Sequence, residues 1–159
     1  MTIKISKQLL IAGTTKSQNN IENAKTILHE CIHAYLFSKA ANPAVGVTFV
    51  ETLNNKYPTA DEQHNFIYDK MIPTMQKVLG EVRDLVTTKT KRDILEGYTM
   101  YPTTNPLTSI LFNWSAYFRY LSLTGLDEAN CFKEDFPKDI DARSLLNQYI
   151  TAGNLELDR

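Results

Sequence analysis

The sequence has few of the residues that would assign it to a specialised structural class. Two cysteines, Cys31 and Cys131, in 159 residues are too few for a disulfide framework. No apolar run approaches the ~20 residues that a membrane-spanning helix needs, and the alternating N-terminus lacks the continuous apolar stretch of a signal peptide. We therefore expect a soluble protein without a membrane span, either cytoplasmic or exported after removal of a signal.

An excess of charge of one sign is also missing. The chain has 17 basic and 18 acidic residues, a formal net charge of -1, and no block of five or six like charges. Because a polyanion would meet no basic excess, we expect no nucleic-acid partner. The composition, 43% apolar and 22% charged, is typical of a globular protein whose length fits one ordinary domain. We predict a single domain over residues 1–159, and these features do not determine its oligomeric state.

Helical periodicity dominates the pattern of apolar residues, so the predicted fold class is helix-rich α+β with a small sheet. Capping and periodicity predict helices at about residues 20–39, 62–79 (interrupted at Pro73), 93–98, 105–125, and from 141 to just before Gly153. Alternating or β-branched residues predict short strands at 3–11 and 45–51.

The best-patterned helix is predicted to begin at Asn105 and Pro106, which suit an N-cap and a first helical position. Its apolar stripe is expected to form part of the core, because large apolar side chains at helical spacing usually pack against the body of a domain. The stripe consists of Leu107, Ile110, Leu111, Trp114, Phe118 and Leu121.

One motif in the predicted first helix carries recognisable chemistry. The segment from His29 to His33 reads His-Glu-Cys-Ile-His and matches the pattern His-Glu-x-x-His. On a helix, two histidines four residues apart share one face, where both imidazoles can bind a single zinc ion. Glu30 follows the first ligand and is expected to project toward the rim of the site.

These residue types suit hydrolysis of peptide bonds in a protein or peptide substrate. Zinc lowers the pKa of a bound water to roughly 7, and a nearby carboxylate can act as general base and then pass the proton to the leaving group. We therefore expect a zinc metallopeptidase in which Glu30 is the general base for a zinc-activated water.

A catalytic zinc site normally has three protein ligands and one open position. The chain contains three histidines, and the third, His64, stands at the predicted start of the second helix. We predict His64 as the third ligand. Because carboxylates also complete such sites, Glu62, Glu51 and Glu96 compete with it, and Glu96 or Asp69 could instead orient a ligand histidine.

A supporting group for the developing oxyanion is expected among the tyrosines. Tyr68 lies one helical turn after the predicted third ligand and is the preferred candidate, with Tyr98 and Tyr101 as alternatives. Cys31 is two residues past the first histidine and should point to another face of the helix, so we predict a small buried packing residue there.

The motif from His29 to His33, followed by a histidine that opens a helix and precedes an aromatic residue (His64, then Phe66), resembles the SprT-like zincin metallopeptidases. The resemblance covers roughly residues 20–80. It implies a zincin-like fold, a single zinc ion held by the three histidines, and the motif glutamate as general base. Some SprT-like proteins carry a further cysteine zinc module, which two isolated cysteines do not support.

Two alternative hypotheses explain the same motif without peptide hydrolysis. The chain could bind zinc without turnover and act as a binding or structural module, in which case a fourth protein ligand would close the metal site. Alternatively, the motif is incidental and the protein binds no zinc.

Overall fold

The computed structural model describes residues 20–39, 47–103, 107–137 and 141–157. Its elements, in chain order, are α2 (Asn20–Lys39), α3 (Phe49–Lys56), α4 (Ala60–Phe66), the π-helical turn η1 (Ile67–Met71), α5 (Ile72–Val86), α6 (Lys89–Glu96), β1 (Thr99–Met100), β2 (Ile110–Leu111), α7 (Trp114–Leu123), α8 (Asn130–Asp135) and α9 (Asp141–Leu157). The two strands pair antiparallel, with Thr99 opposite Leu111. The predicted helix-rich α+β class with a small sheet is confirmed.

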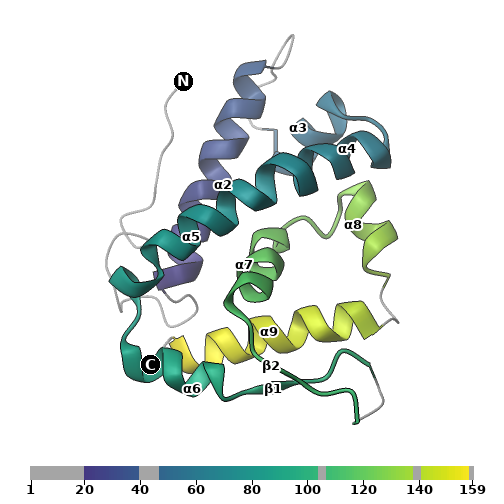
Figure 1. The fold of residues 1–159 in the computed structure, drawn as a ribbon. Helices are drawn as coiled ribbons and strands as arrows, with labels where there is room; N and C mark the ends of the chain where they lie inside the picture. The colour runs from purple at the N-terminus through teal and green to yellow at the C-terminus, as the bar shows by residue number, and fades with distance from the viewer. Residues whose placement is uncertain (1–19, 40–46, 104–106, 138–140, 158–159) are drawn as a thin grey trace.

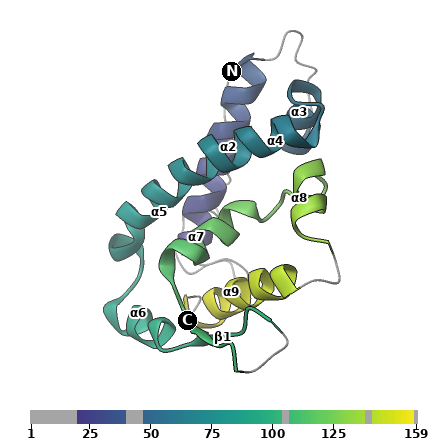
Figure 2. The same cartoon turned by 45° about the vertical axis from the view of Figure 1, so that its right-hand side comes forward.

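The helix α2, which carries the His-Glu-x-x-His motif, packs against three other helices. The long helix formed by α4, η1 and α5 crosses α2, and α7 lies between α5 and α9 (Figures 1 and 2). At the α4 end of the molecule, α3 packs on α2 and α8 packs on α4. At the opposite end, α6 and the strand pair lie beside α9.

Two apolar clusters form the core and are continuous with each other. The first lies among α2, α3, the α4–η1–α5 helix and α8, and includes Phe49 and Phe132. The second lies among α5, α6, α7 and α9, and includes Tyr117. Three partly buried side chains pack against both clusters: Leu28, Tyr120 and Ile150.

The predicted helix 20–39 is confirmed, whereas the predicted strand 45–51 is wrong over its described residues, 47–51. Residues 49–51 begin α3, because Thr48 and Glu51 form a capping box. The Thr48 hydroxyl accepts from the Glu51 N–H at 3.2 Å, and the Thr48 N–H donates to Glu51 Oε2 at 2.7 Å. This paired cap satisfies two N–H groups at the helix start and outweighs the β-propensity of the apolar residues around it. The other predicted strand, 3–11, lies outside the described residues.

The second predicted helix is longer than expected and Pro73 does not end it. It starts at Ala60 behind a second capping box, of Thr59 and Glu62, and continues to Val86. Proline lacks an N–H and its ring crowds the carbonyl four residues earlier, so a regular α-turn would be strained at this point. The wider π turn η1 lies directly before Pro73, and the Ile72 N–H bonds to the Ile67 carbonyl.

Local capping residues also make α6 and α7 start at positions that differ from the predicted ones. The Thr88 side chain caps α6 four residues earlier than the predicted 93–98 helix allowed. Asn113, whose Oδ1 accepts from the Ala116 N–H at 3.0 Å, caps α7. The predicted caps Asn105 and Pro106 lie outside the described residues.

Part of the predicted apolar stripe is not core. The first three stripe residues precede α7, and their side chains are exposed, Leu107 by 90%. Phe118 and Leu121, within α7, are buried as predicted. The helix α8 was not predicted. The helix α9 does not end at Gly153 but continues to Leu157.

The helices of the described part of the chain include none with the length and apolar character needed to span a bilayer.

The close approach of Gly153 to Tyr117 leads to a test of the packing between α9 and α7. A Cβ at Gly153 would lie 2.5 Å from ring atoms of Tyr117, a fully buried side chain that cannot move aside. We expect Gly153→Ala to lower the free energy of unfolding by about 1–3 kcal/mol because of this overlap. Urea denaturation monitored by circular dichroism would measure it.

A matched control lies in the exposed middle of α5. At Gly80 the nearest atom to an added Cβ is Phe118 Cε2 at 3.9 Å, an ordinary contact. Gly80→Ala should therefore raise the free energy of unfolding, by about 0.5–1 kcal/mol, because alanine loses less backbone entropy in a helix. Equal effects at the two glycines would contradict the packing described for α9.

Candidate functional site

The two motif histidines of α2 face α3. The ring of Phe49, the first residue of α3, lies 4.3 Å from the His29 ring and 5.6 Å from the His33 ring, measured between centroids. Phe49 is itself buried. The four-residue spacing of the two histidines therefore places both imidazoles on one face of α2, as the sequence predicted.

His29 sits in a partly buried position that keeps it neutral. The pKa of His29 is lowered from 6.5 to about 4, first by burial and then by the positive charges of Lys25 and His33. Its Nδ1 atom is buried and has no hydrogen-bond partner within the described part of the chain. A neutral imidazole with an unpartnered ring nitrogen is the form in which histidine binds a metal ion.

The hydrogen bonds around His33 indicate which of its nitrogens is free to bind. The Thr52 hydroxyl donates its one proton to the Thr48 carbonyl at 2.9 Å. Thr52 Oγ1 can therefore only accept from His33, whose Nε2 lies 3.3 Å away. In the neutral ring this leaves Nδ1 unprotonated, which is the same nitrogen that is unpartnered in His29.

Glu30 lies beside this nitrogen at the edge of the site. Its Oε2 is 3.8 Å from His33 Nδ1, and its side chain is 46% exposed, compared with 20% for His33. The carboxylate is thus accessible to water and close to the pair of imidazoles. The structure brings His29, Glu30 and His33 together on α2.

His64 and Tyr68 form a second group on the α4–η1–α5 helix. Their ring centroids lie 4.3 Å apart, with the two ring planes tilted by 31°. The side chain of His64 is about half exposed, and its Nε2 lies 3.7 Å from Asp135 Oδ2 on α8. The guanidinium of Arg119 lies 5.4 Å from the Tyr68 ring centroid.

The phenol of Tyr68 keeps its proton at neutral pH. Burial and, secondly, the neighbouring Asp135 carboxylate raise the pKa of Tyr68 well above 10. Even so, neither Tyr68 Oη nor Asp135 Oδ2 has a hydrogen-bond partner of good geometry in the described ranges. The acceptor beside the Tyr68 phenol is the Asp135 carboxylate, whose interaction with the phenol contributes to the raised pKa.

The structure does not bring these two groups into one metal site. Within residues 20–39, 47–103, 107–137 and 141–157, no three His, Cys, Asp or Glu side chains lie close enough together to hold a metal ion. The donor types of His29 and His33 fit zinc, since a neutral imidazole always carries one ring nitrogen without a proton. His64 lies apart from them, and its role as third ligand stays a prediction.

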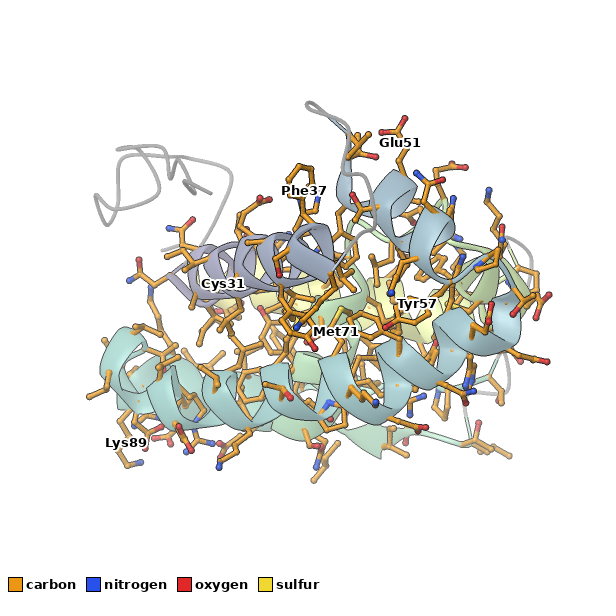
Figure 3. The ribbon with its side chains drawn as sticks, turned by 90° about the horizontal axis from the view of Figure 1, so that it is seen from above. Cys31, Phe37, Glu51, Tyr57, Met71 and Lys89 are labelled. Carbon is orange, nitrogen blue, oxygen red and sulfur yellow. The ribbon has the colours of Figure 1, made fainter. Side chains whose placement is uncertain are left out.

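The three competing carboxylates have structural roles. Glu51 and Glu62 complete the capping boxes at the start of α3 and α4. The hydrogen bonds from Thr48 lower the pKa of Glu51. Glu96 accepts a hydrogen bond from the indole N–H of Trp114 at 2.8 Å. Figure 3 shows Glu51 projecting away from the body of the protein.

One further prediction for this region is wrong, and three neighbours of the histidines were not predicted. Cys31 is exposed rather than buried, because its position on α2 faces neither α3 nor the core. Sequence reasoning missed Phe49, Thr52 and Asp135 as neighbours of the histidines. The Thr-x-x-Glu pattern at residues 48–51 is a signal that could have located the first two, since it marks the start of a helix.

A cavity of about 530 Å³ lies between α3 and the segment that joins α7 to α8. Its lining includes three acidic side chains, Glu51, Asp127 and Glu128, and Lys133, which pairs with Glu128 at 2.8 Å. The buried ammonium of Lys25 on α2 donates to the Thr124 carbonyl at 2.6 Å and so connects this segment to the motif helix.

The lowered pKa of His29 predicts a pH-dependent stability. Between about pH 4 and 6.5 the unfolded chain binds the proton that the folded His29 excludes, so the free energy of unfolding rises with pH across this window. We expect His29 to contribute on the order of 2–3 kcal/mol to this rise. Urea titrations at several pH values, with a chelator present, would measure it.

His29→Gln keeps a polar side chain but removes the titrating group. Its plot of unfolding free energy against pH should be flatter than that of the wild type over the same window. Parallel plots for the two proteins would show that His29 is not held neutral by its surroundings.

Comparison of the chain with protein-family models, with curated proteins and with solved structures finds no match.

Proposed function

We propose that the protein is a zinc-dependent metallopeptidase that hydrolyses peptide bonds in protein or peptide substrates. The supporting observation is the His-Glu-x-x-His motif on one helix, with both imidazoles on the same face beside the Phe49 ring and a buried Nδ1 without a hydrogen-bond partner on His29. His29 and His33 are two of the zinc ligands, and Glu30 is the general base. His64 is proposed as the third ligand and Tyr68 as the oxyanion donor.

Zinc, when bound, would polarise the scissile carbonyl and acidify a water molecule. Glu30 is suited to take the proton of that water, because its carboxylate is half exposed and lies beside His33 Nδ1. The same carboxyl group then gives the proton to the leaving amine nitrogen. Tyr68, which holds its phenolic proton, would donate a hydrogen bond to the oxygen on which negative charge develops.

The proposal requires His64 to approach the pair on α2. In the structure its Nε2 contacts Asp135, whereas His33 Nε2 contacts Thr52. The side chain of His64 is half exposed, so rotation about its side-chain bonds meets little resistance from packing.

Zinc content tests the ligands. We expect about one zinc per wild-type chain by mass spectrometry, and loss of most of it in His29→Ala, His33→Ala and His64→Ala, because each removes one of three nitrogen donors. Cys31→Ser, an exposed position on the same helix, is the matched control and should retain zinc.

Two results would change this assignment. If His64→Ala retains zinc while His29→Ala loses it, the third ligand is another group. If the wild type takes up no zinc when zinc is supplied, the motif is incidental and the proposal is wrong.

Peptide hydrolysis tests the role of Glu30. Glu30→Gln should bind zinc as the wild type does but hydrolyse a peptide library about 10²–10⁴-fold more slowly, because the amide cannot accept the proton of water. Glu81→Gln, an exposed glutamate on α5, is the control and should hydrolyse normally. Zinc binding by the wild type without hydrolysis of any peptide would instead favour a non-catalytic zinc-binding module.

A further inference from the structure

We draw no further inference here: the strongest candidate, the cavity of about 530 Å³ between α3 and the segment that joins α7 to α8, carries nothing because its acidic lining residues Glu51, Asp127 and Glu128 are already hydrogen-bonded or ion-paired within the protein, and nothing in the described part of the chain shows what ligand would occupy it.

Discussion

Leu28, the residue before the first motif histidine, packs against both apolar clusters of the molecule. Together with Ile21 and Leu36, the buried apolar residues of α2, it sets the rotation of α2 about its axis, and with it the faces on which the other side chains of that helix lie. Because Leu28 is directed into the core, His29 and His33 are presented to α3 and Cys31 to solvent. The orientation of the candidate site therefore depends on core packing rather than on contacts of the site residues themselves.

The polar groups near the histidines fall into two kinds. Glu51, Glu62 and Gln63 have their hydrogen bonds satisfied and hold the helix starts and the junction of α3, α4 and α8 in place. Near the histidines, His29 Nδ1, Tyr68 Oη and Asp135 Oδ2 are buried without a hydrogen bond of good geometry to any described residue.

A helix or a contact could be predicted mainly where its sequence pattern lies within one segment of the chain. The helix 20–39 and the helical face of its two histidines follow from apolar spacing within one segment, and both were predicted. The start of α3 was missed although its signal, Thr48 with Glu51, is also local, because the apolar residues around it were weighed as strand formers. The helix α8 carries no strong periodicity over its six residues, and its neighbours Gln63 and His64 are distant in sequence.

The sequence by itself determined the helix-rich class and the motif His29-Glu30-x-x-His33, from which the proposal of zinc chemistry comes, because these depend on composition or on the identity and spacing of residues within a single helix. The tertiary structure alone decided what surrounds the motif. It placed Phe49 and Thr52 against the imidazoles, buried His29 enough to lower its pKa to about 4, and paired His64 with Asp135. These contacts join segments far apart in the chain, so their formation depends on how the helices pack.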